Sequence, residues 1–225
     1  MSDFRFIVAD TETTDATPSA GVCEVAYAEI DENFNIIREH TSLVDPEKPI
    51  SASASGIHGI ADEDVVDSPT LDEYMFVVHE TPPFMGKVVF IAHNAQFDLR
   101  YLGKYIDEHA GTICTLRLAR RFLPNAENHK LQSLMYELKL PRRESHRADS
   151  DVFTTIGLLK HISEVSGVSL RDMVAETEKF IKVETMPFGK HKGTPLVALT
   201  SSYRKWLLEL DNLDPDLKQS LLLLK

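Results

Sequence analysis

The apolar run KVVFIA at residues 87–92 is the feature that most restricts the fold of this 225-residue chain. An uninterrupted apolar run of strand length is typical of a β-strand that is buried on both faces. Helical periodicity dominates after it, and the predicted helices are Ala95–Tyr105, Leu116–Phe122, Lys130–Leu138, Arg147–Val165 and Ser169–Phe180. A strand buried on both faces needs a layer on each side, so we expect an α/β domain.

Three extended runs precede KVVFIA, at Phe4–Ala9, Val22–Ile30 and Ile36–Val44. They are rich in β-branched residues, and the segment DENFN between the second and third suits a hairpin turn. These runs are expected to form an antiparallel meander. A short strand near Thr112–Cys114 would complete a mixed five-stranded sheet flanked by helices.

The composition changes near Lys182. The segment MPFGKHKGTPL is rich in glycine, proline and basic residues, and the amphipathic segments SSYRKWLLEL and DPDLKQSLLLL follow it. We therefore predict two domains, residues 1–181 and a small C-terminal module at residues 182–225 whose role the sequence leaves open.

The formal net charge of −11 disfavours contact with phosphate, but the charge is unevenly distributed. Thr115–Arg147 carries eight basic and three acidic residues. Such a stretch is usually a solvated helix face. Its position just before His146, a candidate catalytic residue, instead favours contact with a nucleic acid. No apolar run is long enough to cross a membrane, and FRFIVAD starts without a charged-then-apolar leader, so a cytoplasmic protein is expected.

Acidic residues occur at predicted strand ends and helix starts in three distant segments. Asp10 and Glu12 lie in DTETT, Asp98 in HNAQFD, and Asp151 in HRADSD together with His146. Each segment alone has a plain explanation, as a surface acid pair, an acid near a helix N-terminus, or a surface histidine. Together, four carboxylates without cysteine suit Mg²⁺ or Mn²⁺. Neutral imidazole is the usual base near neutral pH, so His146 is the candidate proton acceptor.

In this order, DTETT, HNAQFD and HRADSD resemble the three motifs of the DEDDh 3′→5′ exonucleases, which have a ribonuclease H-like fold. The related tyrosine type would need tyrosine where this chain has Arg147. The resemblance covers roughly residues 4–165 and implies release of nucleoside 5′-monophosphates from 3′ ends with two metal ions per site. The 3′→5′ polarity comes from the resemblance alone.

The resemblance also implies individual roles. Asp10 would bridge both ions, Glu12 and Asp151 would help to hold the ion that activates water, and Asp98 would support the second ion. The segment GIHGIADEDV resembles a stretch of bacterial proofreading subunits. Candidate substrate contacts are therefore Ile57, His58 and Phe97 at the 3′-terminal nucleotide, Thr11 and Thr13 at its sugar, and Asn94, for which a helix cap or indirect support is the preferred interpretation. Core packing is an equal alternative for Ile57 and Phe97.

The similarity extends past the nuclease motifs, because CTLRLARRFLP, PFGKHKG and YRKWLLELDNL resemble a DNA-degrading branch of the family. DNA, with single-stranded 3′ ends favoured, is therefore the expected substrate, and DNA repair or turnover the expected setting. An exoribonuclease that acts on RNA and the proofreading subunit of a DNA polymerase are the alternatives. By analogy with relatives, a homodimer is expected.

Overall fold

The structure, a computed structural model, describes residues 4–78, 84–141, 143, 147–210 and 213–224. The chain divides into two compact units, Met1–Thr177 and Glu178–Lys225, called here the first and the second unit. The boundary lies four residues before the one placed between residues 181 and 182 from the sequence. Among the described residues, no helix combines the length and the apolarity that crossing a bilayer would need.

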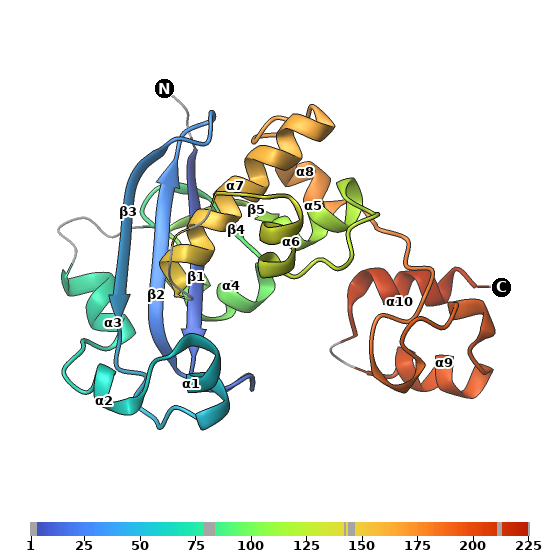
Figure 1. Cartoon of the computed structure of the whole chain (residues 1–225), viewed down its shortest axis with the longest axis horizontal. Helices are drawn as coiled ribbons and strands as arrows, with labels where there is room; N and C mark the ends of the chain where they lie inside the picture. Colours follow the sequence, from blue (N-terminus) through green and yellow to red (C-terminus); the bar gives the residue numbers. More distant parts are fainter. Residues whose placement is uncertain (1–3, 79–83, 142, 144–146, 211–212, 225) are drawn as a thin grey trace. The chain divides into compact units, whose positions relative to one another are not determined.

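A five-stranded sheet forms the centre of the first unit (Figure 1). Its strands are β1 (Arg5–Thr13), β2 (Val22–Ile30), β3 (Ile36–Leu43), β4 (Lys87–Ala92) and β5 (Glu108–Cys114), in the order β3-β2-β1-β4-β5. The β2 strand pairs antiparallel with β1 and β3, whereas β4 pairs parallel with β1 and β5. The predicted mixed five-stranded sheet is confirmed. The β1 strand extends beyond the predicted Phe4–Ala9, so Asp10 and Glu12 lie inside it.

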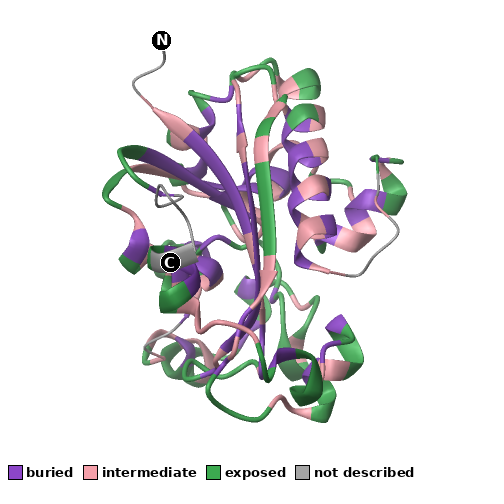
Figure 2. Ribbon diagram, turned by 90° about the vertical axis from the view of Figure 1, so that its left-hand side faces the viewer, coloured by how far each residue is buried: buried purple, intermediate pink, exposed green. Residues whose placement is uncertain are grey.

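Helices cover both faces of this sheet, and the central strands are largely buried (Figure 2). Phe6 and Val8 of β1 point to the face covered by α5 (Thr115–Phe122), α6 (Leu131–Glu137) and α7 (Ala148–Ser166). Ile7 and Ala9 point to the opposite face, which packs against residues from α3 (Leu71–Glu73), η1 (Tyr74–Val78), α4 (Gln96–Leu102) and η2 (Gly103–Tyr105). This alternation follows from the two-residue period of a strand. It places successive residues of β1 toward different helices.

The remaining helices of the first unit are α1 (Ala52–His58), α2 (Asp62–Val65) and α8 (Met173–Glu178). The α1 and α2 helices follow β3 and lie near the end of β1 that carries its last residues (Figure 1). Ile60 and Val65 from this segment bury Cys23 of β2 in a small cluster of their own. The α1–α2 segment is thereby fixed beside the acidic end of β1.

The α4 helix begins later than predicted. Asn94 has a φ of 73°, in the left-handed region, and Ala95 occupies the N-cap position before Gln96. The prediction that Asn94 caps this helix is therefore wrong, because Ala95 and not Asn94 directly precedes the first helical residue. Asparagine is one of the few residues that adopt the left-handed conformation at low cost, and here it turns the chain from β4 into α4.

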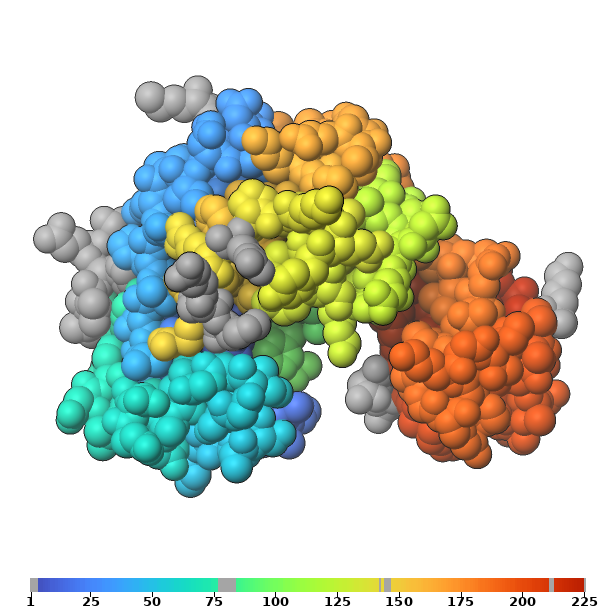
Figure 3. Space-filling view, in the orientation of Figure 1, coloured from blue at the N-terminus to red at the C-terminus, as the bar shows by residue number. Residues whose placement is uncertain are grey.

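The second unit contains η3 (Gly189–His191), η4 (Leu196–Ala198), α9 (Ser201–Leu208) and α10 (Pro215–Leu222). Its hydrophobic core consists of buried residues from this unit alone, namely Met186, Leu196, Leu199, Leu207, Leu213, Leu217 and Leu221. In Figure 3 the orange and red atoms of this unit gather into one compact body. The backbone amides of Ile181 and Val183 donate to the side chains of Asp216 and Ser220 on α10, which attaches the start of the unit to its last helix.

Candidate active site

Asp10 and Glu12 of β1 and Asp151 of α7 form the centre of the candidate site. Each offers one carboxylate oxygen, and these oxygens all lie within 4.8 Å of one another. Asp10 and Glu12 share the sheet face of Phe6 and Val8, which α7 covers, so the period of the strand directs both toward Asp151. Residues that are about 140 positions apart in the sequence therefore bring their carboxylate oxygens into a single cluster.

Asp98 lies in the first turn of α4 and is almost completely buried. Its Oδ1 atom accepts hydrogen bonds from the backbone nitrogen of Thr11, at 3.1 Å, and from the Thr11 hydroxyl, at 2.9 Å. Among the charged neighbours of Asp10, Asp98 contributes most to raising its pKa. Thr11 thus orients the fourth carboxylate beside the cluster, and its predicted contact with the sugar stays a prediction.

Burial and mutual repulsion make ionisation of these acids costly. Burial, followed by the charges of Asp98, Asp151 and Glu12, raises the pKa of Asp10 well above its usual value. Burial, followed by Asp151 and other carboxylates, raises the pKa of Glu12 to about 8. Burial raises the pKa of Asp98 to about 7, against the lowering effect of the hydrogen bonds from Thr11. A divalent cation would offset this repulsion, and oxygen donors alone suit a hard cation such as Mg²⁺ or Mn²⁺.

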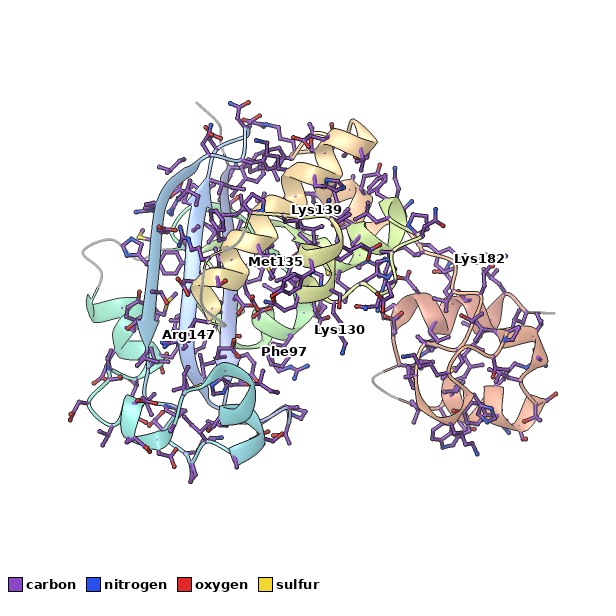
Figure 4. The ribbon with its side chains drawn as sticks, viewed as in Figure 1. Phe97, Lys130, Met135, Lys139, Arg147 and Lys182 are labelled. Carbon is purple, nitrogen blue, oxygen red and sulfur yellow. The ribbon has the colours of Figure 1, made fainter. Side chains whose placement is uncertain are left out.

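Two polar residues that the sequence patterns did not single out support Asp151 and the helix that carries it. The side-chain nitrogen of Gln132 on α6 donates to Oδ1 of Asp151 at 2.5 Å. Glu24 of β2 is 2% exposed and accepts a hydrogen bond from the backbone nitrogen of Ala148, at 3.0 Å. The Nε atom of Arg147 donates to Glu24 at 2.8 Å, and its Nη2 atom forms a second contact there. Figure 4 shows Arg147 at the start of α7.

Sequence could have suggested Glu24 from one weak signal, a charged residue in the middle of the apolar run VCEVAYAEI. The pairing register places Glu24 opposite Glu12 across β1 and β2. Gln132 carries no such signal. His146, the predicted proton acceptor, lies outside the described residues, and its role stays a prediction.

A cavity of about 260 Å³ opens beside the cluster. Glu12 lines it, as do four of the predicted substrate contacts, Thr13, Ile57, His58 and Phe97. Thr11 and Asn94 are absent from the described residues that line it.

The wall residues differ in how they are held. Ile57 is 75% exposed, so it does not serve the core. His58 is buried, and its imidazole contacts the Thr13 carbonyl oxygen at 3.3 Å and the backbone nitrogen of Ile60 at 3.1 Å. Phe97, labelled in Figure 4, packs edge-to-face against Tyr101 with ring centroids 5.5 Å apart. The cavity wall therefore combines the exposed Ile57 side chain with the rings of His58 and Phe97, each of which is held by contacts with neighbouring residues.

An acidic cluster on a mixed sheet, beside a cavity with apolar and aromatic walls, defines a metal-dependent hydrolase of the ribonuclease H-like class. The family model RNase_T, described as exonuclease, matches residues 7–159. The chain belongs to this exonuclease family, which confirms the family inferred from the three motifs.

The chain is similar to known nucleases over most of its length. It is 31% identical to exodeoxyribonuclease 10 of Escherichia coli (strain K12) over 223 residues, or 95% of this chain and 96% of that protein. It is 29% identical to the 3′-5′ exonuclease DinG of Bacillus subtilis (strain 168), over 80% of this chain and 20% of that one.

Solved structures show the same fold. A structure of exonuclease X in complex with 5′ overhanging duplex DNA has a TM-score of 0.62 and 29% identity, over 76% of this chain and 99% of that one. Apo exonuclease I has a TM-score of 0.62 at 17% identity, over 74% of this chain and 43% of that one, and shows likeness of fold alone.

Proposed function

We propose that this exonuclease is a 3′→5′ exodeoxyribonuclease that releases nucleoside 5′-monophosphates from DNA 3′ ends with two divalent cations. The observation that carries the proposal is the convergence of Asp10, Glu12 and Asp151 within 4.8 Å. Similarity to exodeoxyribonuclease 10 along 95% of the chain supports DNA as the substrate. Action in the cytoplasm, in DNA repair or turnover, and as a homodimer, belongs to the same proposal.

The residues of the site have separate roles in this proposal. Asp10, Glu12, Asp98 and Asp151 would hold the cations, with Mg²⁺ or Mn²⁺ as candidates. Bound cations would supply Lewis-acid activation of the phosphodiester and of the attacking water. His146, which precedes Arg147 in HRADSD, would accept the proton from that water.

The cavity beside Glu12 would hold the terminal nucleotide. Its walls favour a sequence-tolerant grip, because the exposed Ile57 side chain and the Phe97 ring offer apolar contact to any base. Thr13 and His58 would fix the floor of this cavity rather than read the base.

The test uses 5′-labelled single-stranded DNA and RNA of one sequence, incubated with the full chain in Mg²⁺ or in EDTA. We expect a ladder that shortens from the 3′ end on DNA, and no cleavage in EDTA or by Asp10→Ala. Asp149→Asn is the matched control, because Asp149 lies on the same helix as Asp151 but outside the cluster.

Each other outcome has a defined meaning. Cleavage of RNA alone would transfer the protein to the exoribonucleases, since every nucleotide of the RNA carries a 2′-hydroxyl that the DNA lacks. Full activity of purified Asp10→Ala would refute the metal site. Shortening from the 5′ end would refute the polarity.

A further inference from the structure

The second unit differs in charge from the rest of the chain. It has eight basic and six acidic residues, within a protein whose net charge is −11. Its segment from Thr185 to Leu208 contains no acidic residue, and its basic residues are Lys190, Lys192, Arg204 and Lys205. Among the described residues, none of these four forms an ion pair. The positive charge of these four side chains is therefore not neutralised by ion pairs among the described residues.

Aromatic rings lie among these charges. The rings of His191 and Tyr203 have centroids 4.5 Å apart, and those of Tyr203 and Trp206 are stacked at 5.3 Å and 26°. The ammonium group of Lys190 lies 5.7 Å from the centroid of the Tyr203 ring. The three rings and the Lys190 ammonium thus form one group around Tyr203. Trp206 in this group is 49% exposed.

The core of the second unit does not require this exposed ring. A core made of Trp206, Leu207 and Leu210 would be the alternative explanation for this tryptophan. Leu207 is completely buried in the structure and Leu210 packs against the core, but Trp206 is not among the core residues. An exposed tryptophan beside unpaired cations is typical of a binding surface.

Backbone hydrogen bonds fix the segments that carry these rings without any ligand. Met186 and Thr194 pair across the loop, because the Met186 amide donates to Thr194 and the Gly193 amide donates to Met186, both at 2.8 Å. The α9 helix is capped by the Thr200 hydroxyl, and Tyr203 packs partly against the core. The rings are therefore preorganised, which reduces the entropy lost on binding.

We propose that this cation–aromatic surface, made of Lys190, His191, Lys192, Tyr203, Arg204 and Trp206, binds a single strand of nucleic acid. Bases would stack on Trp206, and phosphates would contact the lysine and arginine side chains. A single strand fits because its bases expose their faces, whereas those of a duplex are stacked on each other. This inference concerns a surface outside the catalytic cluster and goes beyond the proposed function.

The test measures binding of a fluorescein-labelled 20-nucleotide strand to the full chain in EDTA, where cleavage is suppressed. Trp206→Ala should weaken binding about 5- to 100-fold, as expected from the loss of one stacked base. Trp206→Phe, which keeps an aromatic face, should recover most of the affinity. Lys190→Glu combined with Lys192→Glu should weaken binding and flatten its salt dependence, by about 0.7 in the log–log slope per lost phosphate contact.

Two controls separate this surface from general charge and from catalysis. Lys218→Glu changes the net charge of the same unit at an exposed position of α10 and should bind like the parent. Trp206 is the only tryptophan of the chain, so strand binding should quench the intrinsic fluorescence. Hydrolysis of a dinucleotide, which has no further nucleotides to offer to a second surface, should be unchanged in every variant of the surface.

The outcomes are distinguishable. Unchanged affinity in Trp206→Ala, or absence of strand binding by the parent, would overturn the proposal, and so would equal losses in Lys218→Glu. Parallel measurements with DNA and RNA strands identify the source of the ligand. Binding that depends on Trp206, in a chain that cleaves no DNA strand in Mg²⁺, would refute the proposed function but support this surface.

Discussion

At the residue scale, the carboxylates of the site are arranged at a cost to the metal-free protein. Asp10, Glu12 and Asp151 bring their oxygens within 4.8 Å, and Asp98 is fixed close by through Thr11. Burial, followed by the like charges of the neighbouring carboxylates, disfavours ionisation and raises the pKa values of Asp10 and Glu12. This arrangement of carboxylates suits a bound cation better than it suits the stability of the free chain.

Replacing one carboxylate should relieve this repulsion. We expect Asp151→Asn in EDTA to melt at or above the temperature of the parent, because the amide keeps the acceptor for Gln132 and removes a charge. Mg²⁺ at about 100 times its dissociation constant should stabilise the parent by about 2.7 kcal/mol, or roughly 5–10 °C. The variant should gain far less. Calorimetry with and without Mg²⁺ measures both effects, and Asp149→Asn is the control. Equal increases of the melting temperature in parent and variant on addition of Mg²⁺ would contradict the metal site.

Sequence motifs placed the four carboxylates well but missed the residues that hold them. Asp10, Glu12, Asp98 and Asp151 were identifiable because strand ends and helix starts converge in folds of this kind. Gln132 carried no such signal and Glu24 only a weak one, because their partners are set by the packing of α6 and β2. The hydrogen bond from the Thr11 hydroxyl to Asp98 was likewise not predicted, and the contact of Thr11 with the sugar stays a prediction.

At the scale of elements, α7 depends on a neighbouring strand for its first turn. Its own N-cap residue, Arg147, provides no side-chain capping hydrogen bond. Glu24 of β2 takes that role by accepting from the backbone nitrogen of Ala148, and it also binds the Arg147 guanidinium. The helix that delivers Asp151 is thus aligned by a contact between distant segments.

Glu24→Gln should loosen this alignment while preserving the shape of the side chain. We expect a loss of about 1–3 kcal/mol in the free energy of unfolding, because the buried partner of Arg147 loses its charge and Arg147 is 38% exposed. Activity should fall at least about tenfold, with a higher Mg²⁺ requirement that a purely structural defect would not produce. Urea unfolding and Mg²⁺ titration measure these effects. Normal stability together with a normal Mg²⁺ requirement would exclude the role of Glu24.

Elements with strong periodicity were predicted within a few residues. Val22–Ile30 and Lys87–Ala92 match β2 and β4 as observed, because these runs are buried and bounded by polar turns. The helix predicted over Ser169–Phe180 is shorter, as α8 spans Met173–Glu178. The end of α4 also differed, since the chain tightens into η2 after Leu102. Such ends depend on tertiary contacts that local patterns do not encode.

At the scale of the whole molecule, the two units have separate cores. The buried residues of the second core all lie between Met186 and Leu221, and none belongs to either large cluster of the first unit. Damage to one core should therefore leave the other unit folded.

Leu207→Ala tests this independence. Leu207 is completely buried, so its truncation should cost the second unit about 2–5 kcal/mol. Fluorescence of Trp206 reports the unfolding of this unit alone, because the chain has no other tryptophan. We expect its transition to shift to lower urea, while dinucleotide hydrolysis in the absence of urea stays unchanged. A parallel loss of hydrolysis would show that the units fold as one.

The position of Asp151 on α7 also has a consequence for the newborn chain. Synthesis delivers Asp10 and Glu12 first, then Asp98, and completes the oxygen cluster only when α7 leaves the ribosome and packs against β1 and β2. Until that late, long-range contact forms, the nascent polypeptide lacks one of the three clustered carboxylates. On the proposed function, an enzyme that destroys nucleic acid would thus stay inert during its own translation because of the order in which its segments appear.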